Sequence, residues 1–219
     1  MIESNCISDF DRLGNEVKSG KIAVFPTDTV FGVGTVPTSR KGIARLYKIK
    51  KRHLEKKVPV LFSGVEEVSK FVEMDERAHS IARKFWPGQV TLVLPVTNKL
   101  IPKELLGKEE TLAVRVPNHD CCLRLISACG NALIGTSANF SGSRSFTDPD
   151  EPSLLEFAKQ ADYFVRGPCG KSTLPSTILD LSSPSTISII REGAIPRKTI
   201  EDYMSNISSA DFSLSATSS

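Results

Sequence analysis

Short apolar runs alternate with amphipathic stretches along most of the chain. A short apolar run bounded by turn residues is typical of a buried strand, and apolar residues spaced three or four apart mark one face of a helix. The first pattern predicts strands over residues 22–25, 58–62, 90–96, 111–116, 132–136, 163–165, 177–181 and 186–190. The second predicts helices over residues 9–19, 38–51, 65–72, 75–85, 121–129 and 154–160.

These elements predict an α/β fold in which helices pack on one mixed sheet. A Ser-Ser-Pro-Ser turn at 182–185 joins the last two strands, which predicts an antiparallel hairpin. Ser39 and Asp75 are expected to begin helices, and Ser63 with Glu66 three residues later resembles a capping box.

Length and composition favour one globular unit. The chain has 219 residues, of which 40% are hydrophobic and 24% charged, enough to bury a sizeable core. We predict a single domain over residues 1–204. Residues 205–219 are rich in Ser and lack a sustained apolar face, so they are expected to form a flexible tail.

The sequence carries no targeting signal for a membrane or for export. No apolar stretch is long enough to cross a bilayer, and the N-terminus lacks the pattern of a signal peptide. The five cysteines form no CxxC pair and show no metal-ligand spacing. They are therefore predicted to be reduced thiols in a cytoplasmic protein. The three histidines are scattered and predict no zinc site.

Polar groups and glycines follow the first predicted strand. Thr27, Asp28 and Thr29 lie where that strand ends, a place where α/β sheets tend to hold ligands. Gly32 and Gly34 follow and allow the backbone to approach a ligand closely. From this segment alone, a tight turn with capping residues is an equally good interpretation.

Cations occur at two further places. A basic run at 48–57 has more charge than a helix end needs, which favours contact with phosphates or carboxylates. Arg115 lies in an otherwise apolar strand. It either faces solvent or points into a cleft, where it needs an anionic partner. Thr111, four positions earlier, shares its face of the strand.

The loop at 135–142 contains Ser137, Asn139 and Ser141 after an apolar strand, a composition that suits an anion nest. It has no G-x-S-x-G elbow, so Ser137 is not predicted to be a nucleophile. The Gly-Lys-Ser at 170–172 lacks the glycine spacing of a Walker A loop. The Trp-Pro-Gly at 86–88 is interpreted as architectural, because a lone Trp more often anchors a core.

Together these segments resemble the YrdC/Sua5 family of threonylcarbamoyl-AMP synthases. No single segment is specific, but they occur in the family's order and cover roughly residues 20–195. The resemblance implies a YrdC-like fold, a twisted sheet with flanking helices around a basic concave cleft. It also implies the synthesis of threonylcarbamoyl-AMP from L-threonine, bicarbonate and ATP, with release of pyrophosphate. The matching segments are 26–34, 50–52, 59–61, 86–94, 113–117, 137–142, 176–180 and 190–195.

The product serves the N6-threonylcarbamoyl modification of adenosine 37 in tRNA, through a downstream threonylcarbamoyl-transfer complex. The resemblance makes tRNA itself a possible direct partner. Mg²⁺ is expected to arrive with ATP, held by phosphate and water and by no protein side chain. The chain is too short for the extra domain of the long Sua5 type and resembles the short type.

The resemblance also assigns roles to residues of this chain. Lys50 and Arg52 are the implied catalytic cations. The implied threonine-binding residues are Thr29, Arg115, Gly135 and Ser176. The implied ATP-binding residues are Arg52, Lys56, Thr111, Ser137, Asn139, Ser145 and Arg191.

The chain departs from the family pattern near the basic run. His53 and Lys57 stand where the family usually has proline, and Phe31 replaces a common Tyr. Two other functions stay open. A basic concave face could hold double-stranded RNA or tRNA, although interleaved aromatic residues for stacking are lacking. A carbamoyl-transfer domain of the hydrogenase-maturation type would share the fold but expects acylphosphatase and zinc-finger segments upstream.

Overall fold

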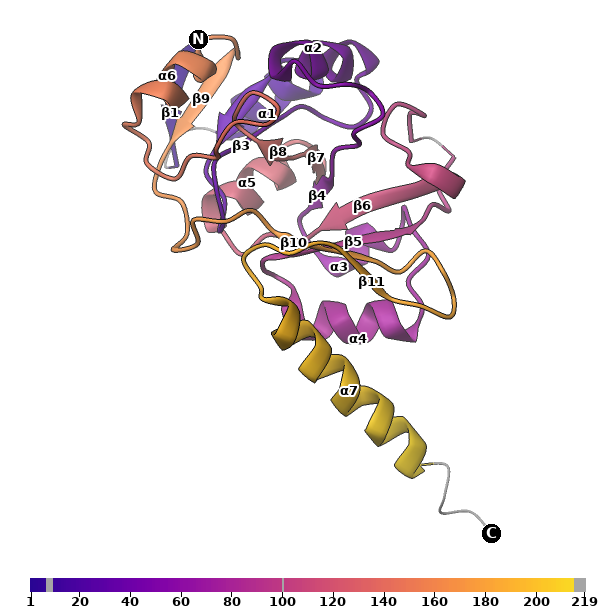
Figure 1. The fold of residues 1–219 in the computed structure, drawn as a ribbon. Coiled ribbons are helices and arrows are strands. Elements are labelled where there is room, and N and C mark those ends of the chain that lie inside the picture. The colour runs from indigo at the N-terminus through magenta and orange to yellow at the C-terminus, as the bar shows by residue number, and fades with distance from the viewer. Residues whose placement is uncertain (7–9, 100, 215–219) are drawn as a thin grey trace.

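Two mixed sheets, rather than the single sheet predicted, form the centre of the molecule in this computed structural model (Figure 1), which describes residues 1–6, 10–99 and 101–214. The five-stranded sheet contains, in spatial order, β1 (Ile2–Asn5), β9 (Tyr163–Arg166), β2 (Ala23–Phe25), β3 (Gly32–Gly34) and β8 (Thr136–Ser137). The six-stranded sheet contains β11 (Ser188–Arg191), β10 (Thr177–Asp180), β5 (Val90–Pro95), β6 (Thr111–Arg115), β4 (Val60–Phe62) and β7 (Ala132–Ile134).

The chain crosses between the sheets at Gly135. The predicted strand over 132–136 divides there, because β7 pairs with β4 in one sheet and β8 pairs with β3 in the other. The two backbones touch at this crossing, since a Cβ on Gly34 would lie 1.6 Å from the carbonyl oxygen of Ile134. Only glycine fits such an approach. The predicted hairpin is confirmed, because β10 and β11 pair antiparallel.

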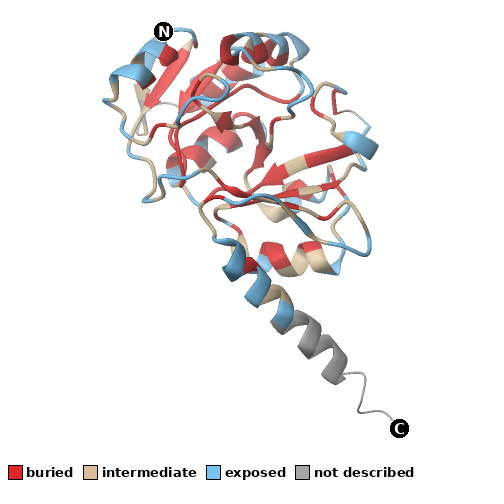
Figure 2. Ribbon diagram, in the orientation of Figure 1, coloured by how far each residue is buried: buried red, intermediate tan, exposed pale blue. Residues whose placement is uncertain are grey.

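Helices cover both sheets, and the buried residues concentrate on the strands and the inner helix faces (Figure 2). α1 (Phe10–Lys18) and α5 (Asp120–Ala128) pack together and share an apolar cluster with Phe25, Leu61 and Leu133. A second and larger cluster receives apolar side chains from the remaining helices. These are α2 (Arg40–Lys50), α3 (Val65–Val68), α4 (Glu76–Phe85), α6 (Pro152–Ala158) and α7 (Arg197–Leu214).

Two of the three predicted helix caps are present. The Ser39 hydroxyl accepts from the Gly42 amide at 3.1 Å, and the Asp75 carboxylate accepts from the Ala78 amide at 2.8 Å. The predicted capping box is wrong. α3 follows Gly64 without a side-chain cap, and the Ser63 hydroxyl donates to Asn131 instead, at 3.0 Å.

α7 extends through residues 205–214, where the sequence predicts a flexible tail; residues 215–219 lie outside the described residues. The helix projects from the body past α4 (Figure 1). Ile200 is fully buried, and Tyr203 stacks edge-on against Phe85 with ring centroids 5.5 Å apart. These contacts anchor the first turns, and the later turns continue a helix already formed, which costs little per residue. Among the described helices, none is long and apolar enough to cross a membrane.

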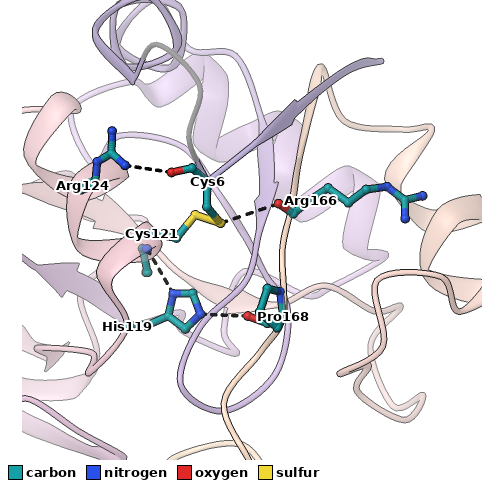
Figure 3. Close-up of a disulfide and its surroundings, with 7 residues drawn as sticks. Cys6, His119, Cys121, Arg124, Arg166 and Pro168 are labelled. Atoms are coloured by element: carbon teal, nitrogen blue, oxygen red, sulfur yellow. Dashed lines mark hydrogen bonds between the residues drawn. A yellow bond between two sulfur atoms is a disulfide. The ribbon is translucent and has the colours of Figure 1, made fainter.

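Cys6 and Cys121 form a disulfide with a Cα–Cα distance of 5.2 Å (Figure 3), so the prediction of five reduced thiols is wrong. Their separation of 115 residues hides the pairing in the sequence. The disulfide joins the segment after β1, an edge strand that the apolar pattern did not reveal, to the start of α5. Cys122, Cys129 and Cys169 remain free.

Candidate active site

A small cavity lies where the two sheets meet. It encloses about 110 Å³, below the ~300–1,000 Å³ of sites for drug-sized ligands, and so suits a ligand of amino-acid size. Its walls come from the β2–β3 connection, the loop after α2, β4, the end of β6, the β7–β8 crossing, the start of β10 and the end of β11. The lining residues are Thr27, Thr29–Gly32, Arg52, Lys57, Pro59, Leu61, Arg115, Gly135–Ser137, Pro175, Ser176, Ile178 and Arg191.

Hydrogen bonds within the β2–β3 connection hold Thr29 at the cavity. β2 ends at Phe25, because Pro26 cannot donate to a sheet. The Thr27 hydroxyl then donates to the Val30 carbonyl at 2.7 Å and accepts from the Thr29 amide at 3.1 Å. Both interpretations of this segment therefore apply, because it is a turn closed by its own side-chain hydrogen bonds and it also forms a wall of the cavity. The Phe31 ring, where the family has Tyr, is fully buried and faces Phe164.

Arg115 is buried, with Asp28 as its partner. The Arg115 Nη2–Asp28 Oδ1 distance is 2.6 Å, and both side chains are less than a tenth exposed. Nη1 donates to the Thr29 hydroxyl at 3.2 Å, and Nε to the Gly88 carbonyl at 2.7 Å. The guanidinium therefore points inward, as one alternative predicted, and the protein itself supplies the anion it needs.

The lining also contains three cations that are less buried than Arg115: Arg52, Lys57 and Arg191. No carboxylate accompanies them in the described lining. Arg52 donates to the carbonyls of Lys56 and Lys57 at 2.7 and 2.9 Å, which closes the loop after α2. Arg191 donates to the Ser176 carbonyl at 2.7 Å. Part of the Arg191 surface is exposed to solvent, but packing of its side chain removes water from the guanidinium. This desolvation, and then the charges of Arg52 and Arg115, lower the pKa of Arg191. Arg191 therefore lies close enough to Arg52 and Arg115 for their charges to act on it.

Lys50, implied to be catalytic, does not line the cavity. Its side chain is 1% exposed, and Nζ donates to the carbonyls of Ser137 and, at 2.9 Å, Asn139. Burial, and then the positive charge of Arg52, lowers the pKa of Lys50 to about 7. Lys50 therefore holds the backbone of the 137–139 segment in place from outside the cavity.

The remaining polar side chains of the lining are held by neighbours. The Ser137 hydroxyl donates to the Asn139 side chain at 2.5 Å, and the Ser176 hydroxyl lies 2.8 Å from that of Thr91. The Gly135 amide donates to the Pro59 carbonyl at 3.1 Å, so this N–H is already engaged. A side chain on Gly135 would collide with Leu61, which keeps this wall open.

The structure brings seven of the implied site residues to the cavity: Thr29, Arg52, Arg115, Gly135, Ser137, Ser176 and Arg191. It does not bring Lys50, Lys56, Thr111, Asn139 or Ser145 there. Thr111 begins β6 whereas Arg115 ends it, which separates them by about 13 Å along the strand. Lys57 and Asp28 are not among the implied site residues, although Lys57 belongs to the predicted basic run and Asp28 to the polar groups after the first predicted strand.

A second cavity is larger than the candidate site. A cavity of about 500 Å³ lies beyond the 137–146 loop, between that loop and α6. Phe140, Phe146 and Phe157 supply much of its wall, and none of the implied site residues lines it. The smaller cavity is the better candidate because it gathers buried polar groups and cations.

The cavity offers little to a divalent cation by itself. Within the described part of the chain, no cluster of three or more His, Cys, Asp or Glu residues could hold a metal, and no carboxylate is in the described lining. Mg²⁺ prefers oxygen ligands and often binds through phosphates and water.

Comparisons with known proteins identify the family of the chain. A family model described as "Telomere recombination", for the Sua5, YciO and YrdC proteins, matches residues 15–193. The chain belongs to this family. A threonylcarbamoyl-AMP synthase of Pseudoalteromonas translucida is 36% identical over 166 residues, which cover 74% of this chain and 87% of that protein.

Solved structures of the family superpose well on this fold. P. abyssi Sua5 complexed with L-threonine has a TM-score of 0.85 at 28% identity. The match covers 93% of this chain but only 61% of the P. abyssi chain, so the chain spans less than two thirds of that relative. E. coli YciO has a TM-score of 0.76 at 25% identity, covering 88% of this chain and 93% of YciO. The family fold predicted from the sequence is thus confirmed.

Proposed function

We propose that this protein is an L-threonylcarbamoyladenylate synthase, which joins L-threonine, bicarbonate and ATP and releases pyrophosphate. The observation that carries the proposal is the cavity itself. It combines an inward-facing arginine and threonine hydroxyl with three cations, Arg52, Lys57 and Arg191, in a space of amino-acid size. The family relatives named for this activity support the same function.

The proposed reaction has two bond-forming steps. The threonine nitrogen bonds to the carbon of bicarbonate, and water leaves to give a carbamate. A carbamate oxygen then attacks the α-phosphorus of ATP, and the bond to the pyrophosphate oxygen breaks. No covalent intermediate with the protein is needed, because positioning and stabilisation of charge suffice.

All three substrates carry negative charge, so their mutual repulsion must be offset. Threonine would bind with its carboxylate toward Arg115 and Thr29, and Ser176 would close the cavity. The triphosphate would meet Arg52, Lys57 and Arg191, the less buried cations of the lining, and bound Mg²⁺ would neutralise part of its charge. Ser137 would contact ATP at the place where Lys50 holds the loop.

The product is expected to pass to a threonylcarbamoyl-transfer complex that modifies adenosine 37 of tRNA, with tRNA itself a possible partner. The proposed compartment is the cytoplasm, where tRNA is abundant. There the Cys6–Cys121 disulfide would face reducing conditions.

Pyrophosphate release from ATP tests the proposal. We expect release that needs threonine, bicarbonate and Mg²⁺ together, and a product with the mass of threonylcarbamoyl-AMP. Omission of each substrate in turn is the control. Tight tRNA binding with no threonine-dependent pyrophosphate would instead favour the RNA-binding alternative.

A further inference from the structure

Every nitrogen of the Arg115 guanidinium makes one hydrogen bond with a partner in the described part of the chain. Nε donates to the Gly88 carbonyl, Nη1 to the Thr29 hydroxyl and Nη2 to Asp28 Oδ1. A guanidinium has five N–H donors in a rigid fork. Two N–H donors, one on each terminal nitrogen, are therefore left for a ligand, and a planar carboxylate can accept from both.

The orientation of this fork depends on Asp28. Of the three partners, only Asp28 carries a charge, and its contact is the shortest at 2.6 Å. Charge-assisted hydrogen bonds are roughly twice as strong as neutral ones, so the carboxylate sets the direction of the guanidinium plane. Without it, only the neutral Gly88 carbonyl and Thr29 hydroxyl would hold the plane.

The backbone of Asp28 is itself held from two sides. The Gln89 side-chain amide donates to the Asp28 carbonyl at 2.9 Å, and the Gly170 amide donates to the neighbouring Thr27 carbonyl at 2.9 Å. A Cβ on Gly170 would lie 2.2 Å from the Asp28 carbonyl oxygen, so only glycine permits this contact. The Gly-Lys-Ser segment at 170–172, which lacks the spacing of a Walker A loop, thus packs against the Asp28 backbone.

The pair is poorly built for stability alone. Asp28 Oδ2 is buried and has no hydrogen-bond partner among the described residues. A buried oxygen without a partner costs free energy, and a buried ion pair often contributes less than apolar packing of similar volume. A role in aligning Arg115 accounts for the carboxylate better than a role in folding.

We propose that Asp28 is a positioning residue for the amino-acid substrate, which it serves by aligning the Arg115 fork with the substrate carboxylate. The proposal rests on the proposed function. Because Asp28 already balances the charge of Arg115, the inner end of the cavity attracts anions weakly. It would select its ligand by the geometry of two parallel hydrogen bonds.

Asp28→Asn tests the proposal, because it keeps the shape and removes the charge. We expect the threonine KM to rise about 10- to 100-fold, since small misplacements at a reacting site have effects of this size. The ATP KM should change less than about threefold, and Asp28→Glu, which keeps the charge, should recover part of the loss. Threonine-dependent thermal stabilisation, measured without ATP, should weaken in parallel.

Asp162→Asn is the matched control. Asp162 also pairs with an arginine, Arg45, but neither residue lines the cavity. This variant should lower thermal stability and leave both KM values unchanged. If Asp28→Asn behaves in the same way, or raises both KM values equally, the proposed role is wrong.

A double-mutant cycle covers the case in which Asp28→Asn leaves Arg115 uncompensated and fails to fold. Arg115→Gln with Asp28→Asn buries no unpaired charge. If Asp28 acts through Arg115, Asp28→Asn should change threonine binding by less than about twofold in the Arg115→Gln background. A large additional loss there would overturn the proposal. Wild-type protein that shows no threonine-dependent stabilisation or pyrophosphate release would refute the proposed function instead.

Discussion

The two ends of the cavity use arginine in different ways. At the inner end, Arg115 is buried and its charge is balanced by Asp28. At the rim, Arg52 and Arg191 donate to backbone carbonyls, and Lys57 donates to the backbone carbonyl of Glu104. These carbonyls carry no net charge, so they do not balance the cations. The inner end is thus close to neutral and presents hydrogen-bond donors in a fixed direction, whereas the rim carries net positive charge.

This difference indicates how one small site could distinguish its substrates. A carboxylate of fixed geometry suits the inner fork, where hydrogen-bond direction decides the affinity. A flexible triphosphate suits the rim, where charge matters more than direction. Substitutions at the two ends should therefore have separable effects on threonine and ATP.

Removal of a rim arginine should give the largest effect. Arg52→Ala is expected to lower kcat/KM about 10²- to 10³-fold, because a charge that stabilises the phosphoryl group is worth about 2.7–4 kcal/mol. Steady-state pyrophosphate release measures this loss. Arg45→Ala, on the preceding helix α2 and outside the cavity, is the control and should remain active. A folded Arg52→Ala variant with normal turnover would contradict a catalytic role for the rim.

Serine in place of threonine probes the inner end without mutation. The two substrates differ by one methyl group, which is worth roughly 1–3 kcal/mol in a fitted pocket. We expect serine to be used about 10- to 200-fold less efficiently than threonine. Comparison of kcat/KM for the two amino acids measures the ratio, and equal values would show that the inner end is not shaped for the methyl group.

Arg115→Lys should affect threonine more than ATP. Lysine keeps the charge but cannot form two parallel hydrogen bonds. Loss of one charge-assisted bond, worth about 1.5–3 kcal/mol, should raise the threonine KM about tenfold or more. Titration of each substrate at saturating levels of the other provides the measurement. Equal increases in both KM values would remove the distinction between the two ends.

Thr29→Ala should have a smaller effect of the same kind. It removes one neutral hydroxyl that accepts from Arg115, worth about 0.5–1.5 kcal/mol, and should weaken threonine binding about 2- to 10-fold. ATP binding, measured alone by calorimetry, should stay near normal. Weaker ATP binding with normal use of threonine would place the amino acid elsewhere.

Lys50 allows a test of stability against pH. Its folded-state pKa of about 7 lies below the ordinary value of 10.5, so between these values the unfolded state binds more protons. Stability should therefore rise with pH across this window and level off at its lower value below about pH 7. Denaturant unfolding from pH 6 to 9 should show this slope in the wild type and a smaller one in Lys50→Met. Parallel curves would mean that Lys50 does not titrate there.

Local patterns determined most of the elements and the order of the site segments. The patterns predicted twelve of the strands and helices to within about two residues at each end, which placed Thr29 in the connection after β2 and Arg115 at the end of β6. Alternation and capping depend on residues a few positions apart, so the sequence can display them directly. The family resemblance then supplied roles that local chemistry could not.

Partners of buried groups were decided only by the tertiary structure. Asp28 and Arg115 are 87 residues apart, and Lys50 and Asn139 are 89 apart. No spacing rule links residues at such separations, and a cation in a motif looks the same whether it faces substrate or a carbonyl. The second sheet and the Cys6–Cys121 bond were hidden for the same reason, because each arises from contacts between distant segments.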